Sequence, residues 1–313
     1  MDAVVGLLDG VRARGAFVLR MMMDPPWSLR IQDDAPLSLI CQTHGNAVIV
    51  GDTSGTDWLR PGDVALARGT QHYVFADDPA TAPMVAIHPG QRCTTLTGDD
   101  LRFEMSLGVR TWGNSSSGAT RSIICAYEGH SEVSARLLDA LPAVLVLRAE
   151  QWDSTLIDLL TAEAGCDGPG QEAYLDRLLD LLLIGVLRTW FDNDANAPIW
   201  WHAEQDAVVG PALKLIYNNP AHPWTVANLA AAVGSSRAAF ARRFAQQVGE
   251  PPIAFLTNWR LALAADLLRS SQATLAAVAR HVGYATPFAL SSAFKRAYGV
   301  SPKAVRAGSY TSE

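Results

Sequence analysis

Hydrophobic and polar residues follow two different patterns along the chain. From about residue 14 to residue 128, short apolar runs are separated by turn-forming residues, which is typical of β-strands. The expected strands are residues 38–42, 47–50, 64–67, 72–76, 84–88, 109–112 and 122–127. Their short, regular spacing predicts an antiparallel β-barrel or sandwich.

Beyond Ser131 the apolar residues recur at helical spacing. Helices are expected at residues 133–141, 152–164 and 171–190, and helical sequence continues to the end. The third of these helices carries a broad apolar stripe made of Leu175, Leu178, Leu179, Leu182 and Val186. Because one barrel alone does not cover such a stripe, helices 133–141 and 171–190 are expected to form the interface of a homodimer.

The change of pattern also places the domain boundary. Residues 192–198 are rich in Asp, Asn and Pro, which predicts a linker. We expect a β-barrel domain with following helices at residues 1–191, a linker at 192–205 and an all-helical domain at 206–313. The predicted fold class is therefore a multidomain α+β protein.

Charge is distributed unevenly between these parts. The net charge of the 313 residues is -6. Residues 211–313 hold eleven Lys or Arg against three acidic residues, a net charge of +8, and residues 1–210 hold the remaining -14. An acidic body joined to a basic end indicates that the C-terminal part binds a polyanion such as nucleic acid.

Several classes of protein are disfavoured by the sequence. The longest strongly apolar run, residues 181–187, is far shorter than the roughly 20 residues that span a bilayer, and the first twelve residues lack the features of a secretory signal. A cytoplasmic protein with no membrane contact is expected. The four cysteines include no Cys-x-x-Cys pair, and we find no phosphate-binding glycine motif, nucleophile elbow or clustered carboxylate pair. We expect neither an enzyme nor a cofactor.

Residues 60–72 contain a Pro-Gly-Asp turn, a short apolar strand and a second turn. Through Gly62, Asp63, Gly69 and His72 this segment resembles the second motif of a cupin barrel, a resemblance that extends over residues 15–130. Metal-binding cupins need three or four convergent ligands, whereas the expected first motif offers only His44. No metal site is expected, although a cupin-type metalloenzyme with a nucleic-acid-binding tail remains the alternative function.

An internal repeat of about fifty residues begins at Trp224. Matching residues of the two copies are Gly234 and Gly283, Phe244 and Phe294, Gly249 and Gly299, and Pro252 and Pro302. In each copy a short amphipathic segment ends at a glycine, which allows a sharp turn, and a second helix follows. Ser235 or Ser236 can cap that helix in the first copy, and Thr286 with Pro287 marks its start in the second. Each copy is therefore predicted to be a helix-turn-helix.

The second helix of each copy is predicted to contact DNA. Phe240 with Phe244, and Leu290 with Phe294, form stripes that should face inward. The outward positions expected to face bases are Arg237, Ala238, Ala241, Arg242, Pro287, Phe288, Ser291 and Ser292. Those expected to contact phosphates are Ser236, Arg243, Lys295, Arg296, Lys303 and Arg306.

The repeat resembles the DNA-binding domain of the AraC/XylS family of transcription activators over residues 210–306. The long helix that joins the two units in that family corresponds to residues 253–269. The resemblance implies a double-stranded DNA operator and RNA polymerase as partners, and a cupin-like module for sensing or dimerisation. Leu290, Ser292 and Val305 replace the family's usual Phe, Arg and Tyr. Without that arginine, base reading should depend more on the first unit.

Two mechanisms of sensing remain open. A small molecule could bind inside the barrel, where Trp27, His44, Trp58 and His72 are candidate pocket residues. Alternatively, an oxidant could modify Cys93, because the adjacent Arg92 and a Pro-Gly-containing loop are expected to lower its pKa and expose it. Cys41 and Cys125 lie in apolar runs and are expected to be buried.

Overall fold

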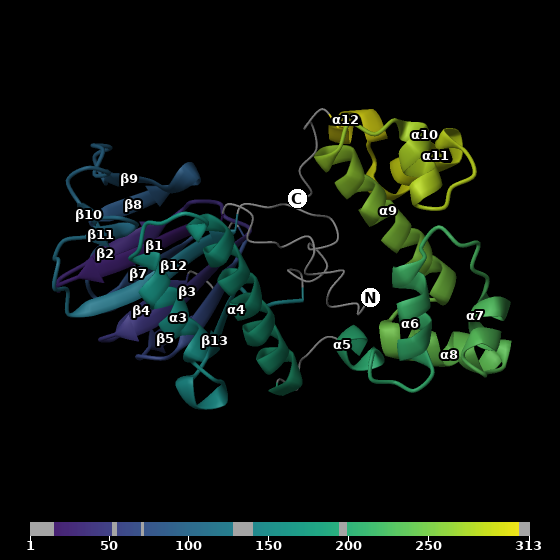
Figure 1. Ribbon diagram of the computed structural model, residues 1–313, viewed down its shortest axis with the longest axis horizontal. Helices are drawn as coiled ribbons and strands as arrows, with labels where there is room; N and C mark the ends of the chain where they lie inside the picture. The colour runs from purple at the N-terminus through teal and green to yellow at the C-terminus, as the bar shows by residue number, and fades with distance from the viewer. Residues whose placement is uncertain (1–15, 52–54, 70–71, 128–139, 194–198, 307–313) are drawn as a thin grey trace. The chain divides into compact units, whose positions relative to one another are not determined.

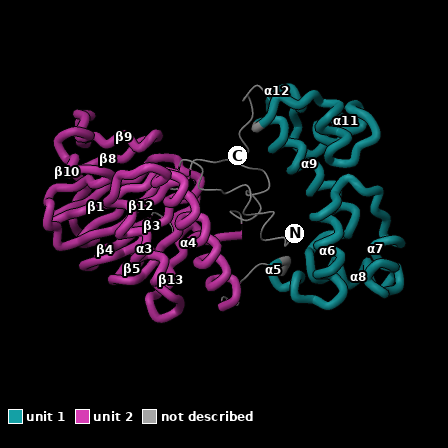
Figure 2. The backbone as a smooth tube through the Cα atoms, in the orientation of Figure 1, with its two compact units in different colours: residues 1–11, 130–137, 194–313 teal, residues 12–129, 138–193 magenta. Residues whose placement is uncertain are grey.

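The computed structural model describes residues 16–51, 55–69, 72–127, 140–193 and 199–306. The chain divides into two compact units, one made of residues 12–129 and 138–193 and the other of residues 1–11, 130–137 and 194–313 (Figure 2). The predicted helix at 133–141 lies almost entirely outside the described residues, as do residues 194–198 of the predicted linker.

Two facing β-sheets form the first of these units (Figure 1). The seven-stranded sheet has the order β10 (Ser106–Gly108), β11 (Thr111–Gly113), β1 (Phe17–Met23), β12 (Thr120–Tyr127), β3 (Leu37–His44), β6 (Val64–Arg68), β13 (Val144–Leu147). The six-stranded sheet has the order β5 (Gly55–Leu59), β4 (Ala47–Gly51), β7 (Tyr73–Ala76), β2 (Ser28–Ile31), β8 (Val85–His88), β9 (Arg92–Thr95). The predicted barrel is thus two open sheets, and the pairs β1–β11 and β2–β8 are parallel rather than antiparallel.

The core of this unit lies between the sheets because alternate side chains of each strand point inward. Met21 and Ile40 from one sheet and Ile49 and Phe75 from the other are all at most 1% exposed. Short 3-10 helices follow β8 (Pro89–Gln91) and β13 (Ala149–Gln151).

Helices α3 (Thr155–Ala164) and α4 (Gln171–Asn193) complete the first unit. They pack against each other, and α3 also contacts β1 and β3. The apolar stripe of α4 that we expected to be covered by a second subunit is at most 6% exposed in the single chain. Our prediction of this stripe as the dimer interface is therefore wrong, because its side chains are already packed.

The other unit is helical. The helices of its described residues, 199–306, are α5 (Ile199–Ala203), α6 (Val209–Asn218), α7 (Val226–Ala232), α8 (Arg237–Val248), α9 (Pro252–Ser270), α10 (Leu275–His281), α11 (Pro287–Tyr298) and α12 (Pro302–Arg306). Helix α5 lies within the predicted linker, where Trp201 is buried and the helix packs against α8. The segment 199–203 is therefore part of the helical unit rather than a linker.

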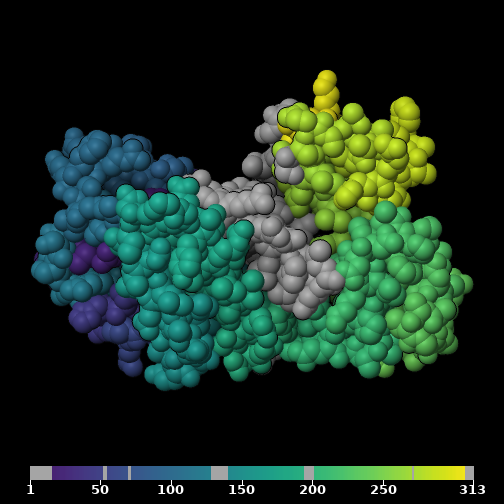
Figure 3. Space-filling view, in the orientation of Figure 1, coloured from purple at the N-terminus to yellow at the C-terminus, as the bar shows by residue number. Residues whose placement is uncertain are grey.

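Helix α9 is the axis of this unit, with the first repeat packed at one end and the second at the other (Figure 1). Phe255 at its first half lies 5.7 Å from Phe244 of α8, measured between ring centroids. Leu261 and Leu268 in its second half belong to the same core as Leu290 and Phe294 of α11. In the space-filling view the first repeat (green) and the second (yellow) form two lobes (Figure 3).

Candidate nucleic-acid interface and cavities

The second helices of the two repeats, α8 and α11, are built alike. Each has 12 residues and starts at a hydroxyl cap, where Ser236 accepts from the backbone N of Ala239 at 3.3 Å and Thr286 from that of Ala289 at 3.1 Å. Each ends at a left-handed glycine, Gly249 or Gly299. The predicted caps and the 50-residue register are thus confirmed, so equivalent positions of the two helices can be compared directly.

The buried stripes of both helices leave a face open to solvent. Phe240, Phe244, Leu290 and Phe294 are 0% exposed. In α8, Arg237, Ala238 and Arg242 are exposed and Ala241 is half-buried; in α11, Phe288 and Ser292 are exposed and Pro287 and Ser291 are half-buried. Both predicted base-facing sets are therefore accessible on the solvent side of their helices.

Basic residues are arranged differently along the two helices. Arg237 and Arg242 lie in the first half of α8, whereas Lys295 and Arg296 lie in the second half of α11. Lys295, Arg296 and the following Lys303 are exposed, and no acidic group of the described residues forms a salt bridge with them. These three cations are therefore free to bind an anion.

Two of the predicted phosphate contacts have partners within the protein. Arg243 lies on the flank of α8, and its Nη2 is 2.8 Å from Oδ2 of Asp206. Oδ1 of Asp206 in turn accepts from the backbone N of Val208 and of Val209 at the start of α6, so this ion pair joins α6 to α8. Arg306 donates from Nη2 to the carbonyl of Ala273. We therefore reinterpret Arg243 as a structural residue; Ser236 is exposed and retains its hydroxyl hydrogen for a phosphate.

A close contact joins the loop that leads into the first repeat to the second repeat. Arg260 of α9 donates from Nε to the carbonyl of Pro220 at 2.7 Å and from Nη2 to that of His222 at 2.8 Å. These bonds hold the α6–α7 loop against the turn of the second repeat, where a Cβ added at Gly283 would lie 2.7 Å from Cα of Ala221. We call this contact the inter-repeat clasp. Sequence reasoning identified Gly283 only as a turn residue, because nothing in its spacing indicates a contact 62 positions away.

The cupin-like motif serves the structure of the first unit. Asp63 is 2% exposed and accepts from Nη1 of Arg148 at 3.0 Å and from the backbone N of Ala149 at 2.9 Å. A Cβ at Gly62 would lie 2.8 Å from Cβ of Ala149. The Gly-Asp pair therefore fixes the turn before β6 to the chain that follows β13.

The four predicted effector residues do not share a cavity. Trp27 is 0% exposed, and its ring packs edge-on against Phe75 in the core. Trp58 is 43% exposed on β5, and His72 faces solvent 3.6 Å from Asp34. Alternation of side chains along short strands did not reveal which face each residue occupies. Within the described residues no three His, Cys, Asp or Glu side chains come together as metal ligands.

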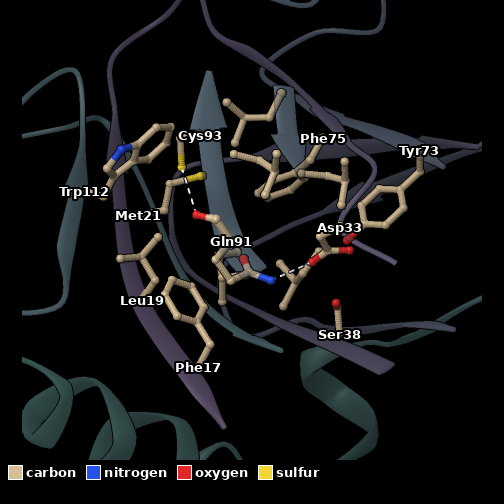
Figure 4. Close-up of a pocket in the computed structure, with 15 residues that line it drawn as sticks. Phe17, Leu19, Met21, Asp33, Ser38, Tyr73, Phe75, Gln91, Cys93 and Trp112 are labelled. Atoms are coloured by element: carbon tan, nitrogen blue, oxygen red, sulfur yellow. Dashed lines mark hydrogen bonds between the residues drawn. The ribbon is translucent and has the colours of Figure 1, made fainter. Parts of the chain in front are cut away.

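A small apolar cavity of about 50 Å³ lies between the sheets (Figure 4). Apolar side chains such as Phe17, Leu19 and Trp112 form most of its wall. At its polar end, Nε2 of Gln91 donates to Oδ2 of Asp33 at 2.9 Å. Pockets for drug-sized ligands usually hold about 300–1,000 Å³, so this cavity accommodates only a very small group.

Cys93 lines the same cavity and is half-buried on β9 rather than exposed in a loop. Its Sγ lies 3.6 Å from the carbonyl of Gln91, which it faces in Figure 4. Burial and, secondarily, the charge of Asp100 raise the pKa of the Cys93 thiol to about 11. Our expectation of a lowered pKa is therefore wrong. Cys41 and Cys125 are buried as predicted, and Cys166 is exposed.

A larger polar cleft of about 380 Å³ lies beside α3, along the central strands β1, β12 and β3 of the seven-stranded sheet. It is lined by side chains that can hydrogen-bond or carry charge, among them Arg20, Thr43, His44, Arg121 and Asp158. Arg121 is held by its own loop, where its Nε donates to the carbonyl of Gly118 at 3.1 Å. His44 is the predicted effector residue that borders this cleft.

Comparison with known proteins supplies two family matches. A cupin family model matches residues 2–192, and a helix-turn-helix domain model matches residues 229–308. No helix of the described residues is long and apolar enough to cross a membrane.

Two relatives that match over almost their whole length are named as transcription regulators. A putative AraC-like transcription regulator of Streptomyces lividans is 30% identical over 313 residues, which cover 96% of this chain and 97% of the relative. The HTH-type transcriptional regulator AlkR of Acinetobacter baylyi is 33% identical over 315 residues, covering 98% and 99%. A putative AraC-like transcription regulator of Streptomyces antibioticus is 40% identical over 174 residues, but the match spans only 56% of its length and 53% of this chain.

Proposed function

This chain belongs to the AraC-like, helix-turn-helix transcription regulators and carries a cupin domain, and from that membership we propose that α8 and α11 read one asymmetric operator in successive major grooves. The observation that carries the proposal is the pair of solvent-facing recognition helices at the two ends of α9. A helix of 19 residues is about 28 Å long. This length is of the same order as the roughly 34–36 Å between equivalent grooves on one face of DNA.

The two helices divide the work of binding in this proposal. Arg242 is exposed directly opposite the buried stripe of α8 and can donate two hydrogen bonds to a guanine edge. Ser292 occupies the equivalent position of α11 and offers only a hydroxyl. Lys295, Arg296 and Lys303 supply phosphate contacts beside α11, which fix register and orientation without selecting a base.

The proposal is tested by comparing Arg242→Ala with Lys295→Ala in the full-length protein. Arg242→Ala should weaken binding to the selected operator by about 1–3 kcal/mol and relax the preference at one base position. Lys295→Ala should weaken binding to all sequences alike and reduce the salt dependence. Arg243→Ala is the control, because it removes an arginine from the same helix whose side chain contacts Asp206 of the protein rather than a base. Equal losses on operator and random DNA for Arg242→Ala would contradict the assignment.

We further propose that the cupin domain senses a small polar molecule in the cleft bordered by His44. The cleft has the volume of a ligand pocket, whereas the cavity between the sheets is too small for one. Polar and charged groups from three strands, β1, β3 and β12, and from α3 would orient such a ligand. The raised pKa of Cys93 disfavours the alternative, an oxidant that attacks its thiolate.

Dimerisation and contact with RNA polymerase complete the proposed function. The face of α3 and α4 that remains open carries Leu159, Tyr174 and Leu181, which are 44%, 50% and 53% exposed. These residues, rather than the buried stripe of α4, are the proposed contact with a second copy. Sedimentation of the full chain at micromolar concentration tests this assignment, and a monomer with and without DNA would contradict it. RNA polymerase is the partner expected for this family. The polymerase and the operator both occur in the cytoplasm, which is therefore the compartment expected for this protein.

A further inference from the structure

Phe288 is the most exposed large apolar residue among the described side chains of the helical unit. Its side chain is 83% exposed, and the other exposed large apolar residue among the described side chains of residues 201–306 is Ile253, at 37%. The other large apolar residues of α11, Leu290, Phe294 and Tyr298, pack in the core of the second repeat. A ring in water contributes nothing to the core, so its role must be sought on the surface.

The position of Phe288 on α11 is well defined. Thr286 caps the helix and Pro287 is its first residue, so Phe288 lies in the first turn. Helical spacing places Phe288, Ser292 and Lys295 on one face, away from the buried stripe. The equivalent residues of α8 are Ala238, Arg242 and Ala245. The face that presents an arginine in the first recognition helix therefore presents an aromatic ring in the second.

The chemistry of the major groove limits what this ring can contact. Base edges there offer hydrogen-bond donors, acceptors and one apolar group, the 5-methyl of thymine. A phenyl ring does not form conventional hydrogen bonds with the donors and acceptors, but it packs against the thymine methyl group.

We propose that Phe288 makes α11 specific for thymine by contacting its 5-methyl group, and that this contact compensates for the arginine missing at Ser292. The inference rests on the proposed entry of α11 into the major groove. Ser292, one turn further along the helix, can hydrogen-bond a neighbouring base, and Lys295 can bind the adjoining phosphate.

Deoxyuridine provides the test, because it differs from thymidine only by the absence of the methyl. An operator is first selected in vitro with the full-length protein, and the half bound by α11 is located by footprinting. Each thymine of that half is then replaced singly by deoxyuridine. For the wild type, one replacement should weaken binding about fourfold, the effect of one buried methyl group. Phe288→Ala should bind the two operators equally, whereas Ser292→Ala, which removes a different base contact, should weaken binding to both operators alike and keep the fourfold ratio.

Several results would overturn the proposal. If no deoxyuridine replacement weakens wild-type binding, or if Phe288→Ala keeps the preference, the ring does not contact a thymine methyl. If Phe288→Ala binds DNA normally but fails to activate transcription by purified RNA polymerase, the ring contacts protein instead. Failure to select any operator would reject the proposed function itself, which is a separate outcome. Because Phe288 is exposed, equal melting temperatures of variant and wild type should verify that folding is unchanged.

Discussion

Replacement of Gly283 by alanine tests whether the inter-repeat clasp holds the two reading units together. Gly283 has a φ of +85° and ends the first helix of the second repeat. The matched control is Gly234→Ala, because Gly234 occupies the equivalent turn of the first repeat with a φ of +66°. The two glycines differ in their surroundings, since a Cβ at Gly234 would meet no atom within 4 Å.

The expected magnitudes follow from this difference. Both substitutions place an alanine in the left-handed region, which costs about 1–2 kcal/mol. At Gly283 the new Cβ would also lie 2.7 Å from Cα and 2.8 Å from the carbonyl oxygen of Ala221, and 2.9 Å from Nη2 of Arg260. Two of these atoms belong to the backbone and cannot rotate away. Overpacking of this kind adds about 1–3 kcal/mol, so Gly283→Ala should cost about 2–5 kcal/mol.

Native-state hydrogen exchange of the full-length protein measures both effects locally. Gly283→Ala should reduce the opening free energy of α10 and α11 and also that of the α6–α7 loop, because the clasp joins them. Gly234→Ala should affect α7 and α8 and leave α10 and α11 protected. If Gly283→Ala destabilises no more than Gly234→Ala, or leaves the α6–α7 loop unchanged, the clasp does not couple the repeats.

Two further predictions concern the first unit. A thermal-shift screen against sugars and small carboxylic acids tests the polar cleft, which His44 borders and Trp58 does not. Compounds that stabilise the wild type should stabilise His44→Ala less and Trp58→Ala normally. Stabilisation that is independent of His44 would argue for another site. In the native protein, iodoacetamide should alkylate the exposed Cys166 faster than Cys93. Because only the thiolate reacts, the alkylation rate at Cys93 should rise about tenfold per pH unit up to about pH 11. Mass spectrometry of the labelled peptides measures both rates, and the opposite order would identify Cys93 as the accessible sensor.

The DNA-binding unit was largely predictable because its determinants are local in sequence. The caps Ser236 and Thr286 and the glycines Gly249 and Gly299 each act within a few residues, and the repeat compares two copies of the same pattern. The ion pair of Arg243 could not be predicted because its partner Asp206 lies 37 positions away, before α6. An acidic residue just before a helix is a recognisable cap, but its pairing with α8 depends on tertiary packing.

The first unit was less predictable because its sites depend on strand pairing between distant residues. The alternating pattern indicated strands, yet not that Trp27 faces the core while Trp58 faces solvent. The order of the sheets, which pairs β1 with β11 and β2 with β8, follows from long-range contacts that no local pattern encodes. The burial of Cys93 has the same origin, because side chains of the opposite sheet line the same cavity and the neighbouring Arg92 does not reveal them.

The position of α9 at the centre of both repeats has a consequence for the evolution of the operators. If α8 and α11 read the operator as proposed, a continuous α9 with a clasp at its middle fixes the distance between them. One base pair inserted between the half-sites would rotate one half-site relative to the other by roughly 34°, which a spacer of fixed length does not accommodate. The exposed faces of α8 and α11, by contrast, lie outside the shared core and can change independently. Promoters and regulator should therefore diverge by base and side-chain substitution within each half-site, while insertions and deletions between the half-sites are eliminated.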